Sequence, residues 1–347
     1  MNSALYDPQE YIFHPSLLDK PRKLGLSGVL VTRADSLTVG AAIDSCIESI
    51  DELIIVLHAP DDQFLDNTKD IVHNKQDKLP DKIKIFEYKA GIFHIPGGEP
   101  HGDKILNKGI HAFANLVNYG MEKSAYSHYM RIDGDHLYFK DQIKEVRDYI
   151  VKNASIFDIF GNNCSSSSSF HNVFYTPHIN IFPSYDAWYV SRYQKPSMEI
   201  FSGLGDHAIH PISSDFYYVA VEKNGELEYP DRLIAALDTD IGKKYTFNWL
   251  GFFSWHLKHV ALFKRYGKFQ NKIPHLKKYH DEVFLRERDS FSHLGNFLEL
   301  SFSQLNIEKI PWMEERIKSA WEHRFHSIDS NVLELIGREP LNSILRG

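Results

Sequence analysis

The chain has 347 residues, 43% of them apolar, and a formal net charge of −7 at pH 7. Such a chain can bury one large hydrophobic core, and its composition excludes a domain-sized disordered region and argues against a general nucleic-acid-binding protein. With only Cys46 and Cys164 and no leader-like start, we expect a protein of the reducing cytoplasm. The most apolar long stretch, 247–263, contains histidines and a lysine, so no transmembrane helix is predicted.

Residues 1–22 are expected to form an irregular N-terminal extension, because several prolines interrupt any regular pattern. The β-branched run 28–32 then predicts a buried strand. Apolar residues at helical spacing over 39–50 predict the helix that follows it, with Asp35 or Ser36 as its cap. A strand that leads directly into a helix is the first unit of an alternating pattern.

The alternation of strands and helices continues along the chain. Buried strands are predicted at 53–58 and 83–88, with a helix-like stretch at 64–73 between them. A further helix, with apolar residues at helical spacing over 105–116, leads to a strand that ends at Asp133. This pattern predicts an α/β fold with a mainly parallel, doubly wound sheet flanked by helices.

An Asp-Gly-Asp triplet, 133–135, follows this last strand and precedes a helix predicted at 141–150 with a possible cap at Asp141. The carboxylates of Asp133 and Asp135 can both turn toward one Mg²⁺ or Mn²⁺ ion, which keeps positions open for phosphate oxygens and water. Asp and Gly are also common turn residues, so a plain turn is the alternative interpretation. The order of strand, acidic loop and helix favours a metal site suited to a diphosphate.

The second part of the sequence is less regular. Strands are predicted at 157–160, 185–190 and 216–221, and helices dominate from about residue 252 onward. The segment 258–278 is rich in lysine and contains interleaved aromatic residues. It is either an ordinary solvated surface or a peripheral contact with anionic lipid.

The order of these elements resembles the GT-A family of nucleotide-sugar glycosyltransferases, particularly the bacterial enzymes that build surface polysaccharides and lipopolysaccharide. The resemblance covers about 24–260. It rests on the opening strand and turn 28–35, on the strand 53–58 with the Ala-Pro-Asp-Asp sequence after it, and on the triplet 133–135, which is similar to the DXD motif of the family. It implies a GT-A (Rossmann-like) domain over 23–255, followed by a mainly helical C-terminal region over 256–347.

By this resemblance, Thr32 and Arg33 hold the base and ribose of the donor nucleotide. Asp133 and Asp135 hold the Mn²⁺ or Mg²⁺ ion that bridges the donor diphosphate. His58 stands where many relatives carry an aspartate near the base, and this difference puts the usual uracil contact in question. All these residues follow predicted strands, and ligands of such sheets bind beyond the carboxyl ends of the strands.

The resemblance also implies functions for two later groups of residues. Asp103, Lys104 and Asn107 stand where relatives contact the nucleotide or donor sugar, although a capped, solvated helix start is the alternative. The segment containing His256 and Lys258 is similar to a loop that completes the metal site in several of these enzymes. The histidine would be a third ligand and the lysine would neutralise the diphosphate. A buried structural histidine is the alternative for His256.

An inverting transfer needs a carboxylate to accept the proton of the acceptor hydroxyl. Asp206, which lies between Gly205 and His207, is the first choice for this base. Asp186 and Asp231 are the alternatives, since the sequence lacks the Glu-Asp pair that is usual in the family.

The sequence therefore predicts a cytoplasmic, metal-dependent glycosyltransferase. It would move a hexosyl group of the galactose or glucose type from a UDP-sugar to a glycan or lipid-linked glycan acceptor, with peripheral contact at the inner face of the membrane through 258–278. One alternative is a phosphohydrolase with Asp133 as nucleophile. Another is a glycan-binding protein that has a transferase-like fold without catalysis.

Overall fold

The structure of the chain is a computed structural model. It describes the greater part of the predicted α/β region and a few short segments of the later sequence. The described residues are 13–33, 35–36, 38–58, 67–89, 112–152, 172–176, 178–183, 188–191, 208–223, 226–233, 244–249 and 253–256.

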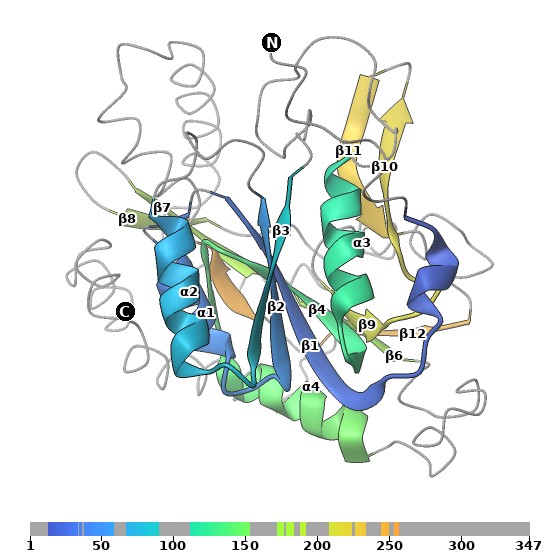
Figure 1. Cartoon of the computed structure of the whole chain (residues 1–347). Coiled ribbons are helices and arrows are strands. Elements are labelled where there is room, and N and C mark those ends of the chain that lie inside the picture. The colour runs from blue at the N-terminus through green and yellow to red at the C-terminus, as the bar shows by residue number, and fades with distance from the viewer. Residues whose placement is uncertain are drawn as a thin grey trace, which may run out of the picture.

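A mixed sheet of seven strands forms the centre of the described structure (Figure 1). In chain order its strands are β1 (Lys23–Thr32), β2 (Glu52–His58), β3 (Ile83–Tyr88), β4 (Tyr126–Asp133), β6 (Asn172–Tyr175), β9 (Ala208–Pro211) and β12 (Thr246–Trp249). Their spatial order is β12-β6-β9-β4-β1-β2-β3. Strand β9 is antiparallel to β4 and β6, and the other neighbouring pairs are parallel. The predicted α/β fold with a mainly parallel sheet is confirmed.

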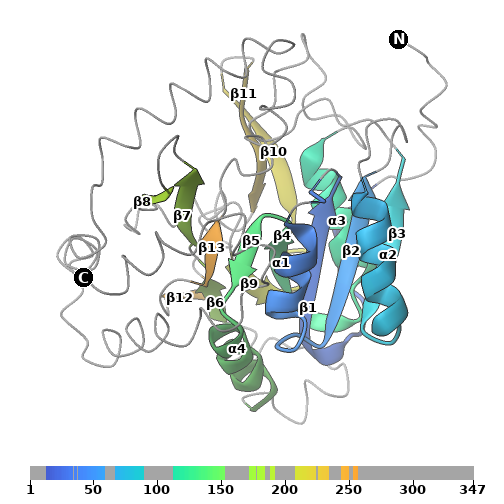
Figure 2. The same cartoon turned by 90° about the vertical axis from the view of Figure 1, so that its left-hand side faces the viewer.

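Helices cover both faces of this sheet, as Figures 1 and 2 show. Helices α1 (Val39–Cys46), α2 (Thr68–Lys78) and α4 (Lys140–Lys152) pack in one hydrophobic cluster, and α3 (Phe113–Lys123) packs in the other. Consecutive strand residues such as Val29 and Leu30 belong to different clusters, because successive side chains of a strand point to opposite faces of the sheet. Helix α3 lies very close to β1 at Gly120, where a Cβ atom would come within 2.3 Å of Val29 Cγ1.

Most elements occur where the sequence predicts them. The predicted strand 83–88 has the bounds of β3, the strand before the triplet ends at Asp133, and β2 begins one residue before the predicted range. Every residue of β2 is buried, as expected of a strand covered on both faces. Helix α4 begins at Lys140, so Asp141 lies in its first turn and is not its cap. The described part of the helix predicted over 105–116 is α3, which begins at Phe113.

Strand β1 begins five residues before the predicted run 28–32. Its first residues pair with the start of β4, and the pairing shifts register between Lys23 and Leu26. Gly25, at this shift, has φ 149°, and a Cβ there would lie 2.5 Å from Asp51 Oδ2. The glycine thus permits an irregularity that local side-chain propensities do not reveal.

The predicted caps and bounds of two helices need correction. Thr38, and not Asp35 or Ser36, is the N-cap residue of α1. The Asp35 carboxylate instead accepts a hydrogen bond of 2.7 Å from Thr32 Oγ1. The stretch predicted over 64–73 corresponds to α2, which begins later and continues to Lys78.

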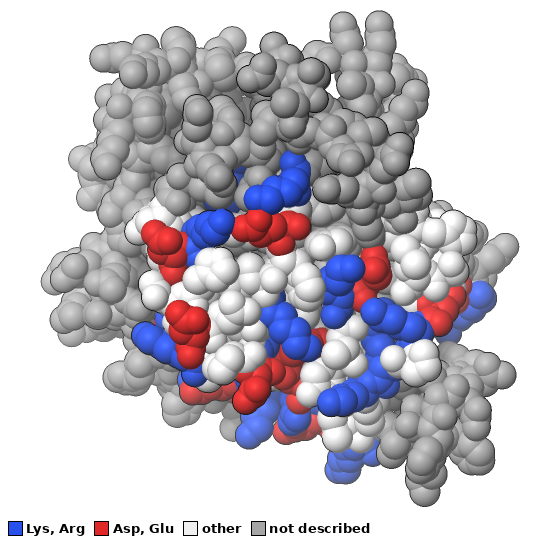
Figure 3. Space-filling model, viewed as in Figure 1, with Lys and Arg blue, Asp and Glu red and all other residues white. Residues whose placement is uncertain are grey.

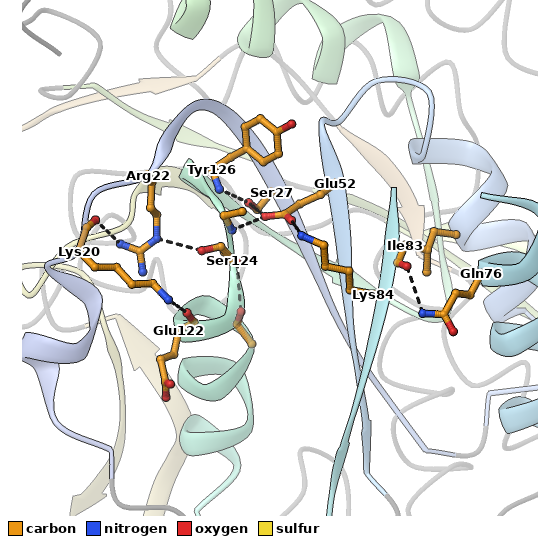
Figure 4. A network of polar contacts seen from close by, with 12 residues as sticks. Lys20, Arg22, Ser27, Glu52, Gln76, Ile83, Lys84, Glu122, Ser124 and Tyr126 are labelled. Carbon is orange, nitrogen blue, oxygen red and sulfur yellow. Dashed lines mark hydrogen bonds and ion pairs between the residues drawn. The ribbon is translucent and has the colours of Figure 1, made fainter. Parts of the chain in front are cut away.

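The described part of the N-terminal extension packs against the end of α3. Residues Pro15–Leu18 form a single 3-10 turn, η2, and Leu18 is fully buried. Arg22 donates to the carbonyl of Ser124 at 3.2 Å, and Lys20 donates to the carbonyl of Glu122 (Figure 4). Cations near the last carbonyls of a helix satisfy its free acceptors and interact well with its dipole. This contact is at the amino edge of the parallel strands, away from the acidic triplet.

A second sheet of four short strands contains β5 (His136–Tyr138), β7 (His178–Pro183), β8 (Trp188–Ser191) and β13 (Ser254–His256), in the order β5-β13-β7-β8. Strand β10 (Tyr218–Lys223) forms a hairpin with β11 (Glu226–Leu233). The strands predicted at 185–190 and 216–221 correspond to β8 and β10, each starting a few residues later. Helices are predicted from about residue 252 onward, but Ser254–His256 form strand β13, because they pair with β5 and β7. The sequence after residue 256 and the strand predicted at 157–160 lie outside the described residues.

Among the described residues, no helix is both long and apolar enough to cross a membrane. On the face shown in Figure 3, acidic and basic side chains of the described surface are mixed. Ion pairs of the described residues include Lys69 with Glu87 at 2.8 Å and Lys75 with Asp44 at 2.5 Å. The lysine-rich segment 258–278 lies outside the described residues.

Candidate metal centre

The acidic triplet lies at the carboxyl edge of the parallel strands. Asp133 is the last residue of β4 and pairs in register with Val31, near the end of β1. The turn after β1 packs directly on the triplet, because an ideal Cβ at Gly134 would lie 3.0 Å from Asp35 Oδ2. Thr32 Oγ1 donates to this same carboxylate oxygen. Two loops that are remote in the sequence therefore form one polar edge.

Asp133 is held by two neighbours. Its Oδ1 atom accepts a hydrogen bond of 2.8 Å from Arg131 Nε, and its backbone N–H donates to the Tyr138 hydroxyl at 2.7 Å. The Arg131 guanidinium also lies over the Phe113 ring, 5.5 Å from its centroid. Burial, and then the Asp133 carboxylate, raise the pKa of Tyr138 well above its usual range, so this hydroxyl stays protonated. Asp133 is thus fixed in place and its charge is compensated.

Two histidines meet beside Asp135. Strands β5 and β13 are antiparallel, and His136 pairs directly with His256, so that their rings stack with centroids 4.4 Å apart. His256 Nε2 lies 3.2 Å from Asp135 Oδ2. His136 Nε2 lies 4.0 Å from Asp135 Oδ1 and 3.8 Å from Asp133 Oδ2. On its other side, His136 Nδ1 lies 2.9 Å from Ser254 Oγ.

These side chains fit a divalent metal. One ligand atom each of Asp135, His136 and His256 lies within 4.8 Å of the other two. Metal–ligand bonds of about 2.0–2.2 Å place ligand atoms about 3.0–3.5 Å apart, so adjustments of about an ångström would complete the site. One carboxylate and two imidazoles are typical donors for a first-row divalent metal.

The structure brings together three residues that the sequence singles out for metal binding, namely Asp133, Asp135 and His256. It adds His136, which sequence reasoning missed. The available signal was its position directly after the triplet, but a histidine at one position in a chain with 19 histidines is not distinctive. Its role depends on the pairing of β5 with β13, which joins distant parts of the chain.

The other predicted residues are further along the edge or outside the described structure. Thr32 is buried at the end of β1 beside the triplet, and Arg33 follows it, half-buried. His58 is buried at the end of β2, with its ring 6.5 Å from the Tyr88 ring. Since β1 separates β2 from β4, His58 and Asp133 are on strands about 10 Å apart. Asp103, Lys104, Asn107, Asp186, Asp206 and Lys258, and the side chain of Asp231, lie outside the described residues.

The close contact at Gly134 gives a testable expectation. Gly134→Ala should lower the free energy of unfolding by about 1–2 kcal/mol, because Asp35 is held by Thr32 and, through its backbone N–H, by Thr68 Oγ1 at 2.8 Å. The matched control is Gly40→Ala in α1, where the nearest atom to a new Cβ is 3.5 Å away. That change should be neutral or stabilising, because alanine favours helix. Urea unfolding curves of the two variants test this, and equal stability would contradict the close packing of the two loops.

Comparisons with known proteins assign no family to the chain. No family model and no curated protein matches it. Among solved structures, one described as the crystal structure of a mycobacterial protein is similar, with 12% identity and a TM-score of 0.33. The match covers 74% of this chain and 79% of that chain. A similarity of this size assigns no function.

Proposed function

We propose that the protein is a metal-dependent glycosyltransferase of the GT-A type. It would transfer a hexosyl group from a UDP-sugar to a glycan or lipid-linked glycan acceptor. The observation that supports this best is the position of the Asp133-Gly134-Asp135 loop at the carboxyl edge of a mainly parallel sheet, with His256 next to Asp135. In open α/β sheets this edge is where ligands bind. Carboxylates there suit a divalent metal that also contacts phosphate oxygens.

The residues at this edge have distinct proposed roles. Thr32 and Arg33, at the end of β1, would contact the donor nucleotide, and His58 at the end of β2 would border the base. When bound at Asp135 and its neighbours, the metal supplies positive charge that stabilises the leaving diphosphate. Arg131 would hold the Asp133 carboxylate in position beside the site through its hydrogen bond of 2.8 Å.

Further roles fall to residues beyond the described ranges. Asp206, or alternatively Asp186, would accept the proton of the acceptor hydroxyl as its oxygen attacks the anomeric carbon. Lys258 would add a second positive charge beside the leaving diphosphate. Asp103, Lys104 and Asn107 would contact the nucleotide or donor sugar.

The test is calorimetric titration of the full chain with UDP and with GDP, in the presence and absence of Mn²⁺. We expect binding that depends on the metal and that is lost in the double variant Asp133→Ala/Asp135→Ala. The control is Asp44→Ala, which removes an exposed α1 carboxylate paired with Lys75 and should bind like the wild type. Failure of the wild type to bind either nucleotide under any condition would contradict the proposal. Recovery of a covalent phosphate on Asp133 would favour the phosphohydrolase instead.

A further inference from the structure

We propose that the metal of this site is held by Asp135, His136 and His256, and that Asp133, the first aspartate of the triplet, is not a ligand. A site of this composition should select a first-row transition metal over Mg²⁺ or Ca²⁺. This inference rests on the proposed function for the use of the metal. The metal preference itself can be tested without any nucleotide.

The pairing of β5 with β13 places the two imidazoles. Residues directly opposite each other on antiparallel strands have Cβ atoms about 4.5–5.5 Å apart and point to the same face. His136 and His256 are such a pair, and their stacked rings are inclined by only 28°. Both Nε2 atoms are within 4.0 Å of an Asp135 carboxylate oxygen. Two donor atoms from paired strands and one from the turn before β5 thus lie within 4.8 Å of one another.

Ser254 supports His136 from behind. The contact of 2.9 Å joins His136 Nδ1 to Ser254 Oγ, and Ser254 is 1% exposed. When Nδ1–H donates to this hydroxyl, Nε2 is the nitrogen without a proton, and it lies 4.0 Å from Asp135 Oδ1. Histidines that bind metals commonly donate their second ring N–H to a fixed acceptor, which sets the tautomer and ring orientation. Ser254 is therefore a positioning residue for this ligand.

The position of Arg131 argues against Asp133 as a ligand. Its side chain is 11% exposed and its Nε lies 2.8 Å from Asp133 Oδ1. Moving Asp133 onto a metal would weaken this pair and leave a largely buried cation poorly compensated. Asp133 also lies outside the group whose ligand atoms are mutually within 4.8 Å. Its Oδ2 atom, 3.8 Å from His136 Nε2, provides negative charge beside the site.

The ligand types decide the metal preference. Mg²⁺ and Ca²⁺ favour oxygen ligands, and Mg²⁺ keeps several of its waters. Imidazole nitrogen favours transition metals. The affinity of a given site for these ions generally rises from Mn²⁺ through Fe²⁺ to Co²⁺, and its affinity for Zn²⁺ depends also on the geometry of the ligands. Two imidazoles and one carboxylate also leave positions open for water or diphosphate oxygens. The site is therefore suited to Mn²⁺, Fe²⁺, Co²⁺ or Zn²⁺.

The experiment titrates the full chain with Co²⁺, Mn²⁺, Zn²⁺ and Mg²⁺ in the absence of nucleotide, by calorimetry and by Co²⁺ visible absorption. We expect Co²⁺ and Zn²⁺ to bind at least about tenfold more tightly than Mg²⁺. Ser254→Ala should weaken Co²⁺ binding by about 10–100-fold, and His136→Asn by at least as much. His73→Ala, which removes a histidine of α2 outside the site, should bind Co²⁺ like the wild type.

Replacement of His136, which is 2% exposed, can affect both folding and metal binding. A second variant therefore replaces the more exposed His256 by aspartate. His256→Asp exchanges a nitrogen ligand for an oxygen ligand, and it should shift the preference toward Mg²⁺. A misfolded protein would lose all metals and would not show this shift. Circular dichroism of each variant confirms that it is folded.

Equal affinity for Mg²⁺ and Co²⁺, or unchanged Co²⁺ binding by folded His136→Asn, would overturn the inference. Its failure is distinguishable from failure of the proposed function. Nucleotide binding that Mg²⁺ supports fully and that His136→Asn leaves intact would overturn the ligand set alone. A clear Co²⁺ preference without any UDP or GDP binding would support the ligand set and contradict the glycosyltransferase.

Discussion

Replacing Glu52 by alanine is expected to lower the free energy of unfolding by about 3 kcal/mol, because buried polar partners would lose their acceptor. Glu52 begins β2 and is 1% exposed. Its Oε1 accepts hydrogen bonds from Ser27 Oγ, at 2.7 Å, and from the backbone N–H of Ala125, and its Oε2 lies 2.9 Å from Lys84 Nζ (Figure 4). One carboxylate thus joins β1, β2, β3 and the residue before β4.

Chemical unfolding followed by circular dichroism measures this loss. The matched control is Glu87→Ala on β3, which removes a carboxylate that is also paired with lysines but is 34% exposed. Exposed ion pairs contribute little, so the control should cost less than about 1 kcal/mol. Glu52→Gln, which keeps one acceptor oxygen, should fall between the two. If Glu52→Ala and Glu87→Ala were equally stable, the buried network would not be important for the fold.

Acidification between pH 6.5 and 4.5 is expected to destabilise the protein through His210. This residue of β9 is fully buried, stacks on Phe216 with centroids 4.8 Å apart, and has its Nδ1 atom 2.8 Å from the Pro211 carbonyl oxygen. Burial lowers the pKa of His210 to about 3, with His128 adding to this effect and the Pro211 carbonyl opposing it. The folded protein therefore keeps this imidazole neutral well below its ordinary pKa.

The sign of the effect follows from proton uptake. In the unfolded chain His210 has an ordinary pKa of about 6.5 and binds a proton first, so its full contribution to stability is present above pH 6.5 and decreases toward pH 3. The maximum slope is about 1.4 kcal/mol per pH unit. Glu87, whose lysine partners lower its pKa to about 2, loses most of its contribution below the ordinary glutamate pKa, so its effect on the window above pH 4.5 is small.

Urea midpoints measured at pH 7.5, 6.5, 5.5 and 4.5 test this expectation. His210→Gln should be less stable than the wild type at pH 7.5, because glutamine packs poorly against Phe216, but its stability should fall less steeply over the same window. His73→Ala, on the surface helix α2, should retain the slope of the wild type. Parallel curves for wild type and His210→Gln would show that another group causes the acid sensitivity.

Several parts of the fold could be predicted from local patterns of residues. A continuous apolar run predicted β2, and a short run rich in β-branched and aromatic residues predicted β3. Helical spacing of apolar residues predicted α1 and α4, because a helix buried on one face has a regular apolar period. The end of β4 at Asp133 was also predicted. Since carboxyl ends of parallel strands share one edge, the sequence also indicated that Thr32, His58 and Asp133 belong to that edge.

The set of residues that meet at the candidate metal centre depends on contacts between distant segments and could not be predicted from local patterns. Strands β5 and β13 have three residues each, too few to show a period, and they come from distant parts of the chain. Their pairing makes His136 a neighbour of His256 and places Ser254 behind it. The antiparallel insertion of β9, which buries His210, is equally non-local. Such contacts form between segments that are distant in the sequence, and a local pattern of residues does not predict which distant segments will pair.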